Sequence, residues 1–233
     1  GSPTAAPVAY PPPWSRPVPM TPPDHALWFA PEAAVTPEDG KSAAFTVTDL
    51  GALTLPTGRL VACDPIVHLG NDDERPEPFT VTVPPGSYPV QTVVTDVEHP
   101  FPHRVIAAAR LVIRDAPVVR WEPALVPGQD PADLADGEFF GYGVDAGVGC
   151  FHDASAHHSF PGTEDEEGVV WETMDGSPAG PTAFLVEGED GHTVAVFDSG
   201  WGDGCYPTWI GRDADGEAVC FVTDFRVFRF APA

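Results

Sequence analysis

Prolines and glycines interrupt this chain so often that long helices are excluded. The 233 residues include 29 prolines and 23 glycines. Proline removes a backbone donor and fixes φ, and glycine permits the positive φ of tight turns, so these residues mark the ends of regular elements. Between them lie short runs rich in valine, threonine and aromatic residues, many alternating between apolar and polar. Such runs are typical of β-strands.

The pattern predicts an all-β fold, either an antiparallel sandwich or a partly open barrel, with long loops and at most a short helix. The predicted strands do not alternate with helices, so the pattern does not favour a parallel sheet. The alanine-rich run 104–114 is compatible with a helix, but its β-branched ends favour a strand. The one predicted helix lies at 130–136, with Asp130 as its N-cap and Pro131 in its first turn. Strands are expected at 44–50, 53–55, 59–63, 79–83, 88–94, 104–114, 117–121, 169–172, 182–187, 192–198, 206–211, 218–225 and 227–230.

Turn residues join several of these strands into hairpins. The expected turns are 56–58, 84–86, 187–191 and 213–216, each containing glycine. Residues 152–168 hold three histidines and four consecutive acidic residues, and are expected to form a long solvated loop.

The chain is expected to contain one β-rich domain, residues 24–233, preceded by a proline-rich tail or arm at 1–23. Gly1 and Ser2 resemble a remnant of cloning. Tyr10, Trp14 and Met20 favour partial docking of the arm on the domain. The chain is long enough to bury a core without metals or disulfides.

The charge is strongly negative, with 35 acidic and 11 basic residues and a net charge of -24. Such a surface disfavours nucleic acids and anionic membranes, and favours basic proteins and cations as partners. The alternative is that the acidity serves solubility alone. The amino-acid usage, with a single lysine, is typical of GC-rich bacterial genomes, and adaptation to high salt is the alternative explanation. No signal peptide or membrane-length apolar run is recognisable, which favours a cytoplasmic location while leaving secretion open.

The four cysteines match no zinc ribbon or CxxC spacing. Cys63 and Cys220 lie in apolar runs and are predicted to be buried thiols. Cys150 and Cys205 lie among glycines. An even number permits two disulfides, but the lack of export features favours reduced thiols.

Two glycine-rich segments, 141–153 and 197–207, combine acidic and aromatic residues and are predicted to meet at one place. The candidate pocket residues are Asp145, Cys150, His152, Asp153, Asp198, Trp201, Asp203 and Tyr206.

The four aspartates of this set would suit Mg²⁺ or Ca²⁺ if they converged. His152 could then act as a base, and Cys150 could act as a nucleophile beside an imidazole. The alternative is that the aspartates only form turns by accepting local backbone N–H groups. A zinc site built from His152, His157 and His158 is a further alternative.

Several segments together resemble a known bacterial family. They are Leu55–Pro65, Pro85–Val90, Arg104–Leu111, Gly141–Gly147 and Asp198–Pro207. Taken together they are similar to domain-of-unknown-function family 4241, over about residues 53–225. The resemblance implies a single globular domain and carries no activity and no catalytic residues.

Two functions remain open. The first is a protein-binding module, immunity- or antitoxin-like, that recognises a basic partner. The alternative is a metal-binding domain or metal-assisted hydrolase that uses the aspartates of the two glycine-rich segments. No GxSxG, P-loop, HExxH or helix-opening GxGxxG motif is present, so no common enzyme class is favoured.

Overall fold

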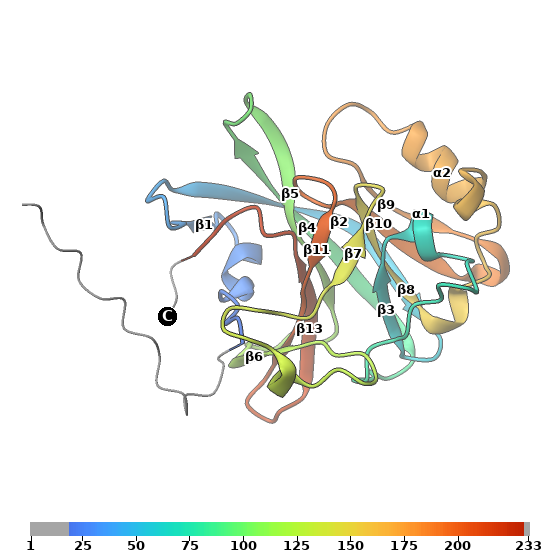
Figure 1. The fold of residues 1–233 in the computed structure, drawn as a ribbon, viewed down its shortest axis with the longest axis horizontal. Coiled ribbons are helices and arrows are strands. Elements are labelled where there is room, and N and C mark those ends of the chain that lie inside the picture. Colours follow the sequence, from blue (N-terminus) through green and yellow to red (C-terminus); the bar gives the residue numbers. More distant parts are fainter. Residues whose placement is uncertain (1–18, 231–233) are drawn as a thin grey trace, which may run out of the picture.

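The computed structural model describes residues 19–230, and two antiparallel sheets dominate it (Figure 1). The larger sheet has seven strands in the spatial order β1-β2-β4-β5-β13-β12-β6. Their bounds are β1 Ala34–Val35, β2 Ala43–Leu55, β4 Gly86–Val97, β5 His103–Val112, β6 Arg120–Pro123, β12 Thr208–Arg212 and β13 Ala218–Asp224. Register shifts in the β2–β4 and β4–β5 pairs mark bulges, which bend the long strands.

The smaller sheet has four strands in the order β3-β8-β10-β9. They are β3 Leu60–Cys63, β8 Val148–Asp153, β9 Ala183–Glu187 and β10 Thr193–Asp198. A separate antiparallel pair joins β7 (Tyr142–Val144) to β11 (Gly204–Tyr206). This architecture confirms the predicted all-β, antiparallel fold class.

The core has three apolar layers, because both sheets are covered on both faces. The main layer lies between the sheets and contains Leu55 and Phe221 from one and Phe151 and Phe197 from the other. A second layer, which includes Trp28, covers the outer face of the larger sheet. A third covers the outer face of the smaller sheet and includes Leu69 and Val170 from two helices. Alternate residues of β3 and β8 therefore face different layers, and both strands are buried throughout.

Short helices fill the connections between strands. The α-helices are α1 Pro65–His68 and α2 Gly168–Asp175, and the 3-10 helices are η1 His25–Phe29, η2 Pro131–Asp133, η3 Ala154–Ala156, η4 Thr163–Asp165 and η5 Glu189–Gly191. The capping prediction is confirmed at η2, where the Asp130 Oδ1 accepts the Ala132 N–H at 2.9 Å. The other helices are additional to the one expected. In Figure 1, α1 and α2 lie beside the smaller sheet.

Several strand predictions are confirmed. The run 104–114 forms β5, and the hairpins β9–β10 and β12–β13 surround their expected turns. The predicted hairpin around 56–58 is wrong, because β2 pairs with β4 in the larger sheet and β3 pairs with β8 in the smaller one. The turn at Gly58 instead carries the chain from one sheet to the other.

Other expectations are also wrong. Residues 79–83 and 227–230 are irregular, and 169–172 lies within α2. The expected loop at 152–168 begins inside β8 and continues through η3 and η4. Phe160 and Thr163 are buried there, so packing against the helices overrides the polar composition.

The arm falls only partly within the described residues. The Met20 N–H donates to the Glu138 carbonyl at 2.8 Å, so the chain contacts the domain at this point. The predictions for Tyr10 and Trp14 lie outside residues 19–230. Between those limits, every helix is too short or too polar to cross a membrane.

Candidate functional site

Strands β3 and β8 bring two thiols and an imidazole together on the outer face of the smaller sheet. Cys63 lies directly opposite Cys150, and Val61 lies opposite His152. Cys150 and His152 are two positions apart on β8 and therefore point to the same face. The two Sγ atoms are 3.5 Å apart, and the Cys63 Sγ is 3.8 Å from the His152 Nε2. All three side chains are buried, and their ligand atoms lie within 4.8 Å of one another. We call these residues the thiol–imidazole cluster.

The His152 ring is held in one orientation by the backbone. Its Nδ1 lies 2.7 Å from the Asp153 carbonyl oxygen, which can only accept a hydrogen bond. The Nδ1–H therefore donates, and the Nε2 faces the sulfur of Cys63. A backbone carbonyl on the second ring nitrogen is the usual support of a metal-binding histidine.

The pKa values of the two thiols are shifted in opposite directions. The hydrogen bond from Cys150, supported by His152 and the nearby His68, lowers the pKa of Cys63 to about 6 against the opposing effect of burial. Burial and the neighbouring Cys63 raise the pKa of Cys150 well above its usual value. At neutral pH the pair is therefore a Cys63 thiolate that accepts a hydrogen bond from the Cys150 thiol.

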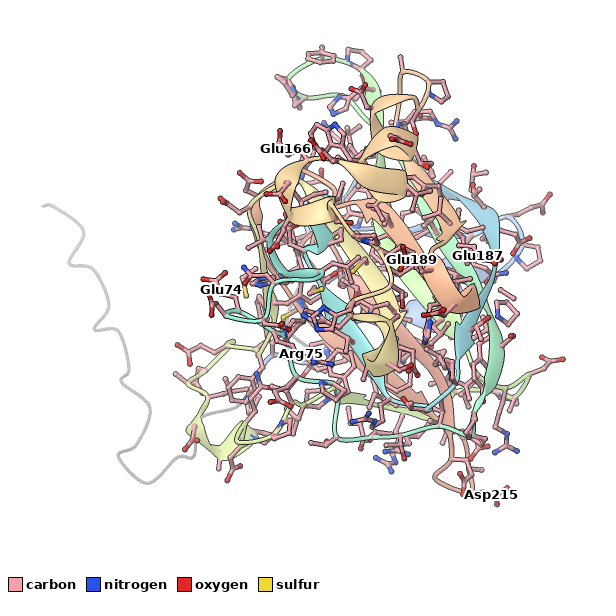
Figure 2. The ribbon with its side chains drawn as sticks, turned by 90° about the vertical axis from the view of Figure 1, so that its right-hand side faces the viewer. Glu74, Arg75, Glu166, Glu187, Glu189 and Asp215 are labelled. Carbon is pink, nitrogen blue, oxygen red and sulfur yellow. The ribbon has the colours of Figure 1, made fainter. Side chains whose placement is uncertain are left out.

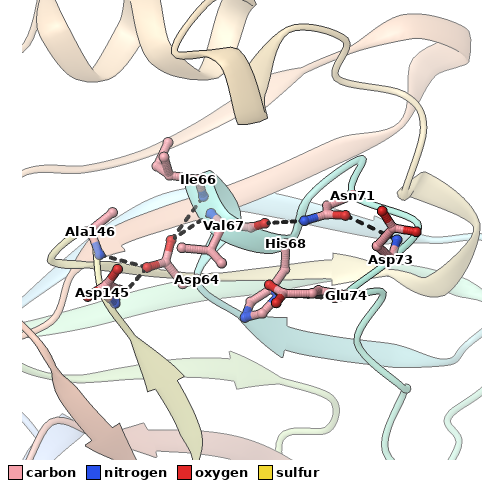
Figure 3. A network of polar contacts seen from close by, with 9 residues as sticks. All are labelled: Asp64, Ile66, Val67, His68, Asn71, Asp73, Glu74, Asp145 and Ala146. Atoms are coloured by element: carbon pink, nitrogen blue, oxygen red, sulfur yellow. Dashed lines mark hydrogen bonds and ion pairs between the residues drawn. The ribbon is translucent and has the colours of Figure 1, made fainter.

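A buried carboxylate fixes the strands that carry this pair. Asp64 follows Cys63 directly, and its Oδ1 caps α1 by accepting the N–H groups of Ile66 at 2.9 Å and Val67 at 3.3 Å. Its Oδ2 accepts the N–H groups of Asp145 at 2.9 Å and Ala146 at 2.8 Å (Figure 3). These bonds tie the end of β3 to the turn that leads into β8. Asp64 thus holds the two cysteines in register.

The loop after α1 folds back over the same region. The Asn71 side chain donates to the Val67 carbonyl at 3.2 Å (Figure 3). The His68 Nδ1 lies 3.0 Å from the Glu74 carbonyl oxygen. This folding brings Arg75 toward the end of β8, where its guanidinium donates to the carbonyl of Ala154, the first residue of η3, at 3.4 Å.

A pocket of about 220 Å³ lies next to the cluster. It is lined by Arg59, Val61, Arg75, Pro76, Glu77, Pro78, His152, Ala154 and His157. His152 belongs to both the pocket and the cluster. Arg75 introduces a positive charge on a side of the molecule that also carries Glu74, Glu166, Glu187 and Glu189 (Figure 2). We call this cavity the basic pocket.

The two glycine-rich segments meet, as expected, but their aspartates do not. β7 pairs with β11, and β8 pairs with β10. Asp198 lies opposite Val148 at the start of β8, whereas Asp153 ends that strand, roughly 17 Å away for five residues of strand. Asp145 and Asp203 are exposed. Neither group of metal-ligating side chains found within residues 19–230 includes any of these four aspartates. The predicted Mg²⁺ or Ca²⁺ site is therefore not assembled.

The two buried or half-buried aspartates act as local hydrogen-bond acceptors instead. Asp153 accepts the Thr57 N–H at 3.1 Å and the Ser155 N–H at 2.9 Å. Burial opposes ionisation of Asp153, but the hydrogen bonds from Ser155 and Thr57 prevail and lower its pKa. The Asp198 Oδ2 accepts the Thr182 N–H at 2.8 Å, although burial still raises the pKa of this carboxyl. These contacts are those of turn-forming aspartates.

The remaining predicted pocket residues lie elsewhere. Trp201 is 52% exposed and lies edge-on to His103, with 5.8 Å between ring centroids. The Tyr206 hydroxyl donates to the Gly202 carbonyl at 2.6 Å and closes its own loop. Of the eight predicted residues, the cluster therefore unites only Cys150 and His152. Its third member, Cys63, was expected only to be a buried thiol, a property that the structure confirms.

The histidine triplet proposed for zinc is divided between two places. His152 belongs to the thiol–imidazole cluster, whereas His157 and His158 lie next to Asp72. The Asp72 Oδ1 is 3.3 Å from the His157 Nε2 and 3.0 Å from the His158 Nε2. All four cysteines are free thiols in the structure.

Comparison with known proteins gives a family but no activity. The family model described as a protein of unknown function, DUF4241, matches residues 53–223. The chain therefore belongs to this family. The match spans β3, β8 and every residue of the thiol–imidazole cluster. No curated protein and no solved structure matches the chain.

Proposed function

We propose that this member of the DUF4241 family is a metal-binding domain that holds Zn²⁺ between Cys63, Cys150 and His152. The spacing of the ligand atoms carries the proposal. Tetrahedral zinc, with Zn–S about 2.3 Å and Zn–N about 2.0 Å, places its sulfurs about 3.8 Å apart and sulfur and nitrogen about 3.5 Å apart. In the structure the Sγ atoms of Cys63 and Cys150 are 3.5 Å apart, and the Cys63 Sγ is 3.8 Å from the His152 Nε2.

The chemistry of the ligands selects the metal. Thiolate and imidazole favour Zn²⁺ or Cu(I), whereas Mg²⁺ and Ca²⁺ need oxygen ligands. The lowered pKa of Cys63 supplies one thiolate near neutral pH. Three protein ligands leave one tetrahedral position for water or a ligand, as in catalytic zinc sites.

The proposal requires both thiols to be reduced. Cytosolic thiols are kept reduced, so a cytoplasmic location suits this site. Oxidation of Cys63 and Cys150 to a disulfide would remove two of the three ligands.

Cobalt titration tests the site, because Co²⁺ bound by thiolates gives a charge-transfer absorption that other ligands do not. The experiment uses reduced protein carrying Cys205→Ser, since Cys205 is exposed and would bind metal adventitiously. We expect one Co²⁺ per chain, displaced by one equivalent of Zn²⁺. The signal should disappear in Cys63→Ser and Cys150→Ser.

Cys220→Ser is the matched control, because Cys220 is equally buried but lies outside the cluster. It should retain the cobalt signal in full. A parent protein without thiolate absorption, or an equal loss in the control, would contradict the proposal.

Binding of a basic protein is a second candidate, supported by a specific surface. Phe101 and Trp201 are 63% and 52% exposed, and His103 lies between them at 4.9 Å and 5.8 Å between ring centroids. Exposed aromatic residues are frequent hot spots of interfaces, and the net charge of -24 favours a basic partner. Affinity isolation with the parent and Trp201→Ala proteins tests this candidate. A basic partner that the parent retains and the variant loses would support it, and equal retention would contradict it.

A further inference from the structure

The basic pocket concentrates positive charge in a chain that has little of it. Only 11 of the 233 residues are lysine or arginine, against 35 acids. Arg59 and Arg75 both line this one cavity, together with His152 and His157. They come from four separate segments of the chain: the connection before β3, the loop after α1, strand β8 and the turn after η3. The fold, and not local sequence, therefore creates this concentration.

Neither arginine forms an ion pair among residues 19–230. Other arginines do pair with acids, as Arg104 does with Asp96 and Arg212 with Glu122. Within the described part of the chain, the only hydrogen bond of the Arg75 guanidinium is the long one to the Ala154 carbonyl, at 3.4 Å. A guanidinium presents five donors in a planar fork, which matches the oxygens of a carboxylate or phosphate. Both arginines thus retain donors for an anion.

His157 provides a second, independent observation. Its side chain is only 2% exposed, yet its Nδ1 has no hydrogen-bond partner in the described part of the chain. Burial, with the charges of Arg75, His158 and His152, lowers the pKa of His157 and outweighs the opposing effect of Asp72. A buried polar atom without a partner costs about 1–3 kcal/mol and indicates a missing ligand or water.

We infer that the basic pocket binds the oxyanion of a small ligand, a carboxylate or a phosphoryl group, through Arg59, Arg75 and His157. The cavity of about 220 Å³ has room for such a group and a short substituent. Glu77 also lines the pocket and opposes the anion, so it limits the affinity. The inference goes beyond the proposed zinc site and does not depend on it, since none of these three residues belongs to the thiol–imidazole cluster.

Calorimetric titration of the metal-free protein at constant ionic strength tests the inference. Inorganic phosphate and succinate serve as separate probes, which distinguishes the two chemical classes. We expect saturable binding of one molecule of at least one probe per chain. Arg75→Gln and Arg59→Gln should each weaken it about tenfold, because each removes a charge-assisted contact. Glu77→Gln should strengthen it.

Two control variants make the outcome decisive. Arg104→Gln removes an exposed arginine that lies outside this pocket, and it should leave the affinity unchanged. Cys63→Ser removes a proposed metal ligand and should also retain anion binding, so the two proposals can fail separately. Absence of saturable binding by both probes, or equal weakening in Arg104→Gln, would overturn the inference.

Discussion

Replacing Asp64 with alanine should destabilise the protein more than any ordinary loss of a helix cap. The carboxylate is fully buried and accepts four backbone N–H groups, two from α1 and two from the turn before β8. Loss of an N-cap costs about 1 kcal/mol. Each hydrogen bond to a charged group contributes about 1.5–3 kcal/mol to stability. We take the lower value for the bonds from the Asp145 and Ala146 N–H groups, because these residues are exposed and water can replace the lost carboxylate.

These contributions predict a loss of about 4 kcal/mol in the free energy of unfolding. A domain of this size loses about 2–4 °C in Tm for each kcal/mol, so we expect a decrease of about 8–16 °C. Equilibrium urea unfolding of the reduced, metal-free protein, followed by circular dichroism and tryptophan fluorescence, measures the change directly. Metal must be absent because its binding would stabilise the native state independently.

Asp130→Ala is the matched control for this prediction. Asp130 also caps a helix, but it makes a single exposed bond to the Ala132 N–H. It should lose about 1 kcal/mol or less. Asp64→Ser should fall between the two, because serine can cap α1 but cannot reach the turn before β8. Equal losses for Asp64→Ala and Asp130→Ala would refute the claim that the buried carboxylate ties β3 to β8.

Three further changes have expected outcomes. Zinc binding at pH 8 should release about one proton per chain. The proton comes from Cys150, because its raised pKa keeps it a thiol beside the Cys63 thiolate. Calorimetry in buffers of different ionisation enthalpy counts the released protons. Thr57→Val should destabilise the protein at pH 7 and progressively less as the pH falls, as urea unfolding over a series of pH values will show. The lowered pKa of Asp153 stabilises the fold at neutral pH, and this contribution disappears as pH falls through the folded-state value. Gly58→Ala should lower the free energy of unfolding by roughly 2–4 kcal/mol, since Gly58 has φ +69° and a Cβ there would lie 1.8 Å from a backbone oxygen. Thermal unfolding measures the loss. Gly143→Ala is the control, because a Cβ at Gly143 would meet nothing within 4 Å.

The fold class was predictable because period-two patterns and turn residues are local signals. The strand at 104–114 and the hairpin around 213–216 could be predicted in this way. The pairing of β3 was not predictable, since a Pro-Thr-Gly turn is compatible both with a hairpin and with a crossing between sheets. Helix α2 was missed because Val169 and Val170 favour strands locally, whereas burial of Val170 beneath the helix decides the outcome.

The site was harder to predict, because it depends on register between distant segments. Cys63 and Cys150 are 87 positions apart, and a shift of one residue in the β3–β8 pairing would turn one thiol toward the opposite layer. Cys150 and His152 were identified from the density of functional residues around them. The aspartates in the same segments gave a false indication of a metal site, since glycine-rich turns need such residues for their own backbone hydrogen bonds.

His152 belongs to both proposed sites, so we expect their occupancies to be coupled. A zinc ion on its Nε2 would add positive charge at the wall of the basic pocket and should therefore strengthen oxyanion binding. By linkage, the anion must strengthen zinc binding by the same factor. Titrating phosphate with and without zinc, and zinc with and without phosphate, measures this factor twice in the same protein. Equal factors above one would place the pocket within electrostatic reach of the metal. Equal factors of one would mean that the two sites share a side chain without sharing a function.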